Sequence, residues 1–166
     1  MFKVNFKKTL SNVVIILLIF FTDRFSKIYI LQIAELENKV DIYLSPFLNF
    51  YLIWNKGVAF GLFSFNDEVI YNFITLIIII IIMVILFMLI KSTGFQRYSL
   101  LMVFGGSLGN LYDRINFLGV PDFIDFHVGS FHWFIFNVAD IFITIGVICL
   151  IYAEIFMNKK VKKENE

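Results

Sequence analysis

The sequence predicts a mainly α-helical membrane protein, with four transmembrane helices and a small β-sheet in its outer loops. Hydrophobic residues make up 60 % of the chain and aromatic residues 19 %, and the mean hydropathy of +0.85 is far above that of soluble domains. Residues 69–90 form an uncharged apolar run, long enough for the roughly 20 residues that cross a bilayer. Three weaker apolar runs, at about 11–31, 98–114 and 137–157, complete the predicted spans.

The first run, 11–31, is predicted to stay in the mature protein as a helix. Three lysines precede it, as they do in a secretory signal peptide. However, no small-residue cleavage site follows the run, and charged residues interrupt it between positions 23 and 27. These features favour a retained span over a cleaved one.

The two segments 32–68 and 115–136 are the predicted outer loops. Within the first, 40–63 is rich in aromatic and β-branched residues and contains turn signals, which predicts two or three short strands. Since an unpaired sheet edge cannot face lipid, this sheet should lie on the membrane surface. The second loop contains "FHWFIF" and is predicted to lie along the same surface as an aromatic segment. With no repeat and no linker, 1–166 is predicted to be a single domain.

The distribution of basic residues predicts that both termini are cytoplasmic. Nine lysines and arginines lie in the N-terminal segment, in the 91–97 connection and in the tail after 157, whereas the two outer loops hold two. Cytoplasmic segments carry the excess of such residues, so both long loops are predicted to lie outside. The net charge of +1 gives no indication of a nucleic-acid partner.

Four aspartates are predicted to converge in the outer half of the bilayer. Asp23 and Asp113 come late in spans that run outward, Asp140 opens a span that runs inward, and Asp122 precedes that span in the outer loop. A charge at the bilayer centre costs about 2.5–3.5 kcal/mol on insertion scales. Such a cluster therefore indicates a functional site.

Part of this polar set also has structural explanations. Asp23 and Lys27 are four residues apart on a helix and can neutralise each other. Arg114 shares a helical face with Asn110 and can act as an interfacial anchor. From the residues alone, both interpretations of these groups stay open.

The stretch "GGSLG" at 105–109 matches two unrelated motifs. As a G-x-x-x-G it indicates close helix packing, whereas the G-x-S-x-G of serine hydrolases needs a sharp strand-to-helix turn. Ser107 lies inside an apolar helical run, so packing is favoured. His127 and His132 are five residues apart and lack a metal-type spacing, so no metal site is predicted.

Asp122 and Asp140 differ from the other acids because no basic residue lies within four positions of either. Two carboxylates held close at one apolar site cannot both ionise, so one keeps its proton while the other activates water. This is the chemistry of an aspartic protease. Two alternatives remain open: a membrane transporter or assembly factor whose acids form a proton or cation path, and a serine protease that uses Ser107.

Five short motifs are spread over nearly the whole chain: "TDRFSK", "WNKGVAFG", "GGSLGNLYDR", "VPDF" and "FNVAD". In order and spacing they resemble the motifs of the lipoprotein signal peptidase (signal peptidase II) family, the bacterial intramembrane aspartyl proteases. The resemblance implies that Asp122 and Asp140 are the catalytic aspartates. It implies substrate-binding or supporting roles for the other polar motif positions, which are Asp23, Lys27, Asn55, Asn110, Asp113, Arg114 and Asn137.

The same resemblance implies the task. Members of this family cleave the signal peptide from a diacylglyceryl-modified prolipoprotein, just before the lipidated cysteine, at the outer face of the bacterial plasma membrane. It also implies four helices, a surface sheet, no cofactor, and lipidated prolipoproteins and membrane lipid as partners; we expect a monomer. Two departures are Pro121, where a β-branched residue is more usual, and Asp125, an additional acid.

Overall fold

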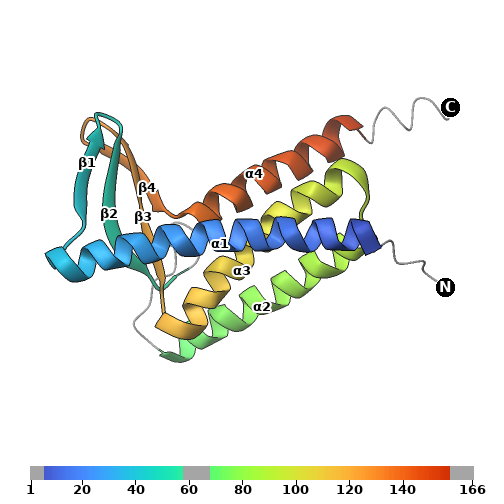
Figure 1. Cartoon of the computed structure of the whole chain (residues 1–166), viewed down its shortest axis with the longest axis horizontal. Helices are drawn as coiled ribbons and strands as arrows, with labels where there is room; N and C mark the ends of the chain where they lie inside the picture. Colours follow the sequence, from blue (N-terminus) through green and yellow to red (C-terminus); the bar gives the residue numbers. More distant parts are fainter. Residues whose placement is uncertain (1–5, 58–67, 158–166) are drawn as a thin grey trace.

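The structure, a computed structural model, describes residues 6–57 and 68–157 (Figure 1). Predictions that fall on 1–5, 58–67 and 158–166, among them the basic tail and the second half of "WNKGVAFG", lie outside the described residues. The helices are α1 (Phe6–Glu37), α2 (Glu68–Lys91), α3 (Gly94–Phe117) and α4 (Val138–Tyr152), which a π-helical turn (Ala153–Met157) continues. The strands are β1 (Asp41–Ser45), β2 (Leu48–Asn55), β3 (Val120–Val128) and β4 (Phe131–Phe136).

The helices form an elongated bundle with the sheet at one end (Figure 1). α1 and α3 run toward the sheet, whereas α2 and α4 run away from it. α3 lies at the centre of the bundle and packs against α1, α2 and α4. The connection between α3 and β3 and the one between β4 and α4 therefore both lie at the sheet end. This arrangement brings polar residues from separate parts of the chain together there.

The four strands form one antiparallel sheet in the order β1-β2-β3-β4. The second outer loop, which was predicted as an aromatic segment along the membrane surface, belongs to this sheet, since residues 120–136 supply the hairpin of β3 and β4. This pairing was not predicted from the sequence. The two-residue turn at 129–130 is the overlooked signal, because Gly129 adopts a positive φ of 59° and hairpin turns favour such residues. Strand pairing satisfies backbone groups that lipid would leave without partners.

Helices α1 and α3 are longer than the spans that the sequence predicted at 11–31 and 98–114. Among the described residues, two helices, Glu68–Lys91 and Val138–Phe156, are long and apolar enough to cross a membrane by length and composition alone. α1 and α3, with 32 and 24 residues, have the length, since a helix rises 1.5 Å per residue, but they contain charged groups. Five of these charged residues are buried, namely Asp23, Arg24, Lys27, Asp113 and Arg114. The outward-facing parts of the bundle carry exposed apolar side chains such as Phe25, Phe73 and Ile148.

Glycines in α3 let the neighbouring helices approach closely. A Cβ atom on Gly105 would lie 3.1 Å from Ile19 of α1, and one on Gly109 would lie 2.6 Å from the Asp23 carboxylate. The packing interpretation of the G-x-x-x-G motif is thus confirmed. Ser107 lies between these glycines in the interior of α3, so the turn that a serine-hydrolase motif requires is absent at this position.

Replacing Gly106 by alanine should destabilise the protein, because the new Cβ would lie 2.6 Å from the carbonyl oxygen of Ala139 and 2.9 Å from Ile143. Overpacking of this kind costs about 1–3 kcal/mol, which thermal unfolding in detergent would detect as a lower Tm. Gly129→Asn is the matched control, because its φ of +59° suits asparagine and no atom lies within 4 Å. Equal Tm values for the two variants would contradict the close α3–α4 contact.

Candidate active site

A cavity of about 530 Å³ lies where the sheet meets α2, α3 and α4. Its size is typical of small-ligand sites. One part of its wall is apolar and comes from α2 and α4, with Ile78, Ile82, Ile143 and Val147 among its residues. The polar part contains six of the nine site residues predicted from the sequence: Asn55, Asn110, Arg114, Asp122, Asn137 and Asp140.

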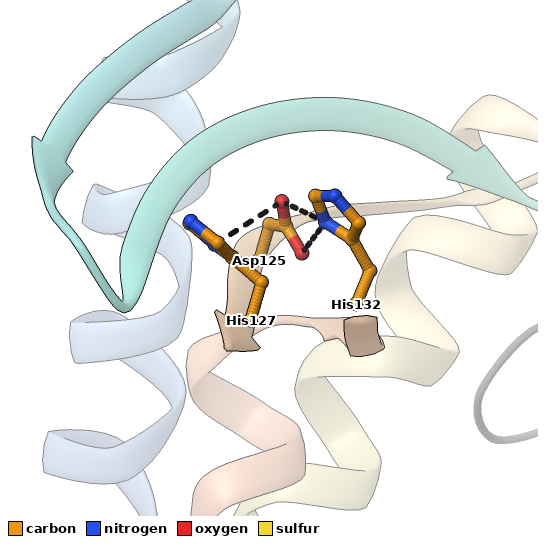
Figure 2. Close-up of side chains that lie close together, drawn as sticks. All are labelled: Asp125, His127 and His132. Carbon is orange, nitrogen blue, oxygen red and sulfur yellow. Dashed lines mark hydrogen bonds and ion pairs between the residues drawn. The ribbon is translucent and has the colours of Figure 1, made fainter. Parts of the chain in front are cut away.

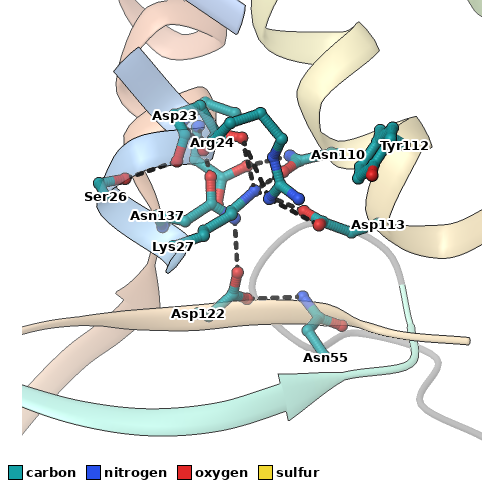
Figure 3. Close-up of polar contacts among 12 residues, drawn as sticks. Asp23, Arg24, Ser26, Lys27, Asn55, Asn110, Tyr112, Asp113, Asp122 and Asn137 are labelled. Carbon is teal, nitrogen blue, oxygen red and sulfur yellow. Dashed lines mark hydrogen bonds and ion pairs between the residues drawn. The ribbon is translucent and has the colours of Figure 1, made fainter. Parts of the chain in front are cut away.

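Asp122 projects from β3 and is only 1 % exposed. Its Oδ1 accepts a hydrogen bond of 2.6 Å from Asn137 Nδ2, and its Oδ2 accepts one of 3.0 Å from Asn55 Nδ2 (Figure 3). Burial, reinforced by the charge of Asp140, raises the pKa of Asp122 to about 7. This carboxyl group therefore keeps its proton up to nearly neutral pH.

Asp140 occupies the third position of α4 and forms a capping box with Asn137. The Asn137 backbone N–H donates to Asp140 Oδ2 at 3.2 Å, and the Asp140 N–H donates to Asn137 Oδ1 at 3.1 Å. The other carboxylate oxygen, Oδ1, accepts a hydrogen bond of 2.8 Å from Asn110 Nδ2. These donors hold the Asp140 carboxyl group in a fixed position at the start of α4 and satisfy both of its oxygens.

Asn137 links the two carboxyl groups through different atoms of one side chain. Its Oδ1 caps α4 beside Asp140, and its Nδ2 donates to Asp122. The side chain is fully buried, so its amide has a single arrangement that satisfies both contacts. The two carboxyl groups are thereby held at one cavity wall by the residue that starts the helix.

Behind the cavity lies a buried cluster of charged residues from α1 and α3. The Lys27 ammonium donates to Asp23 Oδ2 at 2.9 Å, to Asn110 Oδ1 at 2.9 Å and to Asp113 Oδ2 at 2.7 Å. A second cation, Arg24, lies 2.6 Å from Asp113 Oδ1. Two cations thus face two anions, which lowers the cost of burying each charge. Asp23, Lys27 and Asp113 do not line the cavity.

The charged cluster also orients groups that do line the cavity. Asp23 Oδ1 accepts a hydrogen bond of 3.0 Å from the backbone N–H of Ala139, in the first turn of α4. Lys27 fixes the oxygen end of the Asn110 amide, so that the nitrogen end points to Asp140. The Asp23 and Lys27 pair therefore does more than neutralise its own charges.

Arg114 is buried and lines the cavity, so its interpretation as an interfacial anchor was wrong. Its Nη2 donates to the carbonyl oxygen of Gly57, and its guanidinium lies 5.7 Å from the centre of the Tyr71 ring. Its Nη1 is buried and has no hydrogen-bond partner in the part of the chain that the structure describes.

Two contributors to this site were missed in the sequence. In the sequence analysis, Arg24 counted only as an interruption of the first span. A count of the charges in the spans would have indicated its role, because two buried acids, Asp23 and Asp113, need two cations. The Ala139 backbone N–H carries no signal in the sequence, because every residue except proline has one.

The chain is similar to two solved structures that are described as bacterial membrane enzymes. Their TM-scores are 0.76 and 0.73, and their sequence identities to this chain are 31 % and 30 %. The first match covers 94 % of this chain and 93 % of the solved one, and the second covers 88 % and 93 %. The model of the signal peptidase (SPase) II family matches residues 15–156, and the chain belongs to this family.

Relatives with high identity support the same assignment. The chain is 58 % identical to the lipoprotein signal peptidase of Pelagibacter ubique (strain HTCC1062), over 99 % of this chain and 98 % of the relative. It is 34 % identical to the lipoprotein signal peptidase of Anaplasma marginale (strain Florida), over 93 % and 89 %. The resemblance seen in the five sequence motifs is confirmed.

Proposed function

We propose that the chain is an aspartic endopeptidase that removes signal peptides from diacylglyceryl-modified bacterial prolipoproteins, cutting just before the lipidated cysteine. The observation that carries the proposal is one cavity with two unlike walls. Asp122 and Asp140 line its polar wall, and isoleucine and valine side chains of α2 and α4 line the other. A substrate with a lipidated cysteine after an apolar signal helix is divided in the same way. Its polar backbone would face the polar wall, and its apolar chains would face the apolar wall.

In the proposed mechanism, Asp140 is ionised at rest and Asp122 carries the proton. A water molecule between them transfers a proton to Asp140 and attacks the scissile carbonyl carbon, while Asp122 protonates the carbonyl oxygen. When the tetrahedral intermediate collapses, the carbon–nitrogen bond breaks. The proton held by Asp140 then passes to the leaving amine, and Asp122 regains its proton from the new carboxyl group. No cofactor takes part in these steps.

The remaining polar residues of the cavity are proposed to hold the substrate. Arg114 has a buried Nη1 with no hydrogen-bond partner among the described residues, which suits a peptide carbonyl or a lipid ester oxygen. Asn55 and Asn137 each donate from Nδ2 to Asp122 and so position the acid. Asn110 does the same for Asp140. Asp23, Lys27 and Asp113 are proposed to support these groups from behind.

We further propose that all four helices span the plasma membrane, with both termini cytoplasmic and the sheet at the outer face. Burial of the charges of α1 and α3 against each other supports this, since their outward faces are apolar. Lys7, Lys8 and Arg97 gather around one depression at the end of the bundle away from the sheet. Such residues favour the cytoplasmic side. The substrate would then meet the cavity from within the bilayer.

The proton on Asp122 predicts a loss of activity at alkaline pH. Because its pKa is raised to about 7, the proton is present below that pH and is lost above it, so kcat/KM should fall about tenfold per pH unit beyond the transition. A raised pKa also destabilises the folded state as pH rises from about 4 to about 7. The difference in Tm between Asp122→Asn and the unchanged protein, taken as variant minus unchanged, should therefore increase from pH 5 to pH 8. If kcat/KM began to fall only above pH 9, the assignment of the catalytic proton to Asp122 would be contradicted.

The proposed function is tested by cleavage of a synthetic precursor peptide with a diacylglyceryl-modified cysteine, and of the same peptide with a free cysteine. We expect the purified protein to cut only the lipidated peptide, immediately before the cysteine, as mass spectrometry of the products would show. A covalent serine reagent should leave cleavage intact, as should Ser107→Ala. If the serine reagent abolished cleavage, the serine-protease alternative would be favoured. If neither peptide were cleaved, the proposal would be refuted.

A further inference from the structure

Three groups that commonly bind metal ions meet near the turn of the β3–β4 hairpin: Asp125, His127 and His132 (Figure 2). One possible ligand atom from each lies within 4.8 Å of the other two. Asp125 Oδ2 is 2.8 Å from His132 Nδ1 and 3.8 Å from His127 Nδ1. None of the three lines the cavity with Asp122 and Asp140, so this cluster is separate from the proposed active site.

The hairpin register explains why the linear spacing gave no metal signal. His127 and His132 are five positions apart in sequence but directly opposite each other in the β3–β4 pair. Their rings are stacked, with centroids 5.0 Å apart. Asp125 precedes His127 by two residues, and side chains two apart on a strand project from the same face. Two ligands from β3 and one from β4 therefore converge on one point.

Two buried polar atoms in this sheet have no hydrogen-bond partner among the described residues. One is Nδ1 of His127, a residue that is only 8 % exposed, and this atom faces the Asp125 carboxylate (Figure 2). The other is Oδ1 of Asn49, which is paired with Asp125 in the β2–β3 register. An unpaired buried polar atom costs about 1–3 kcal/mol. A cation bound between His127 and Asp125 would remove this cost for His127 Nδ1.

The geometry suits a small tetrahedral ion. With metal–ligand bonds of about 2.0–2.1 Å, adjacent ligand atoms in a tetrahedron lie roughly 3.3–3.4 Å apart. The observed separations of 2.8 and 3.8 Å from Asp125 Oδ2 lie on either side of this value. The His132 ring, which stacks on His127, would also have to turn, because a metal ion lies in the plane of each imidazole that binds it. The His132 side chain is 56 % exposed, which leaves it free to turn and leaves the ion accessible from solvent.

We propose that Asp125, His127 and His132 bind one Zn²⁺ ion, with Asn49 Oδ1 or a water molecule in the fourth position. Two imidazoles and a carboxylate are a recurrent zinc donor set. The ion would join β3 to β4 near their turn. Because Asp125 follows Asp122 by three residues on β3, the ion would also brace the strand that carries Asp122. It would take no part in the cleavage reaction.

Zinc binding by the full-length protein tests this proposal directly. The protein should carry no polyhistidine tag and should first be stripped of metal, after which Zn²⁺ is titrated in competition with a chromophoric chelator. We expect one equivalent of Zn²⁺ to bind, and His127→Ala and His132→Ala each to weaken binding at least about tenfold. Zinc should also raise the Tm of the unchanged protein but not that of His132→Ala. The exposure of His132 makes this variant the safer one for folding.

The matched control is Glu37→Gln, which removes an exposed acid at the end of α1 on the same side of the molecule. It should bind zinc as tightly as the unchanged protein. The proposal is overturned if the unchanged protein shows no saturable zinc uptake, or if the double variant His127→Ala/His132→Ala binds zinc equally well. In either case the cluster is a histidine–aspartate hydrogen bond with a stacked histidine pair and no metal.

Discussion

Replacing either Asp122 or Asp140 by asparagine is expected to abolish cleavage of a lipidated precursor, with a loss of at least about a thousandfold in kcat/KM. An amide at position 122 could no longer protonate the carbonyl oxygen, and an amide at position 140 could no longer accept a proton from water. The residual rates of the two single variants and of the double variant should be similar, because groups that act as a unit do not contribute additively. Single-turnover cleavage of the diacylglyceryl peptide measures all three.

The folding of these variants separates chemistry from structure. Both substitutions keep a side chain of nearly the same shape beside the amide donors of Asn137, Asn55 and Asn110, so a cooperative thermal transition should remain. Asp41→Asn is the control, since Asp41 is an exposed acid of the same sheet that pairs only with Lys39 among the described residues. Cleavage by Asp122→Asn or Asp140→Asn at the rate of this control would refute the proposed pair of catalytic aspartates.

Replacing Lys27 by methionine is expected to destabilise the protein by about 3–5 kcal/mol, because it would leave Asp23 and Asp113 buried with Arg24 as their remaining cation. Cleavage should also fall, since Asn110 would lose the contact that orients it toward Asp140. Adding Asp113→Asn to the variant should recover part of the stability by removing one buried charge. Thermal unfolding in detergent and the amount of protein in membranes measure this effect.

Lys39→Met is the matched control for that experiment. Lys39 also pairs with a nearby aspartate, at 2.6 Å, but the two side chains are 63 % and 51 % exposed. Exposed ion pairs contribute little to stability, so this variant should unfold close to the temperature of the unchanged protein. If Lys27→Met were no less stable than Lys39→Met, the buried cluster would not hold α1 against α3.

Local sequence patterns predicted the helices well and the sheet only in part. The run 69–90 became α2 almost residue for residue, because length and uniform hydrophobicity are local properties. The pairing of β2 with β3 joins residues such as Ile53 and Asp122 that are far apart in the chain. A local sequence pattern cannot predict which strand will pair with which, because every isolated strand has the same unpaired backbone groups. The hairpin of β3 and β4 was readable from its turn at 129–130 and was overlooked.

Depth along the spans predicted which polar residues gather at one end, but not which of them face the cavity. Asp113 and Arg114 are adjacent in sequence, yet a helix turns by about 100° per residue. Asp113 therefore faces Lys27 and Arg24 of α1, whereas Arg114 lines the cavity. Rotation about the helix axis depends on packing against neighbours, and the glycines of α3 set that packing.

In the proposed mechanism, the capping box at Asn137 makes an ordered first turn of α4 necessary for activity. The first turn of a helix frays more readily than its middle, and here that turn contains Asp140 while its cap holds Asp122. If the turn opened, both carboxyl groups would lose their alignment in the same event, although the bundle stayed folded. Inactivation on heating should therefore precede global unfolding and reverse on cooling. The thermal limit of the enzyme would then be set by a few residues at a helix end rather than by its core.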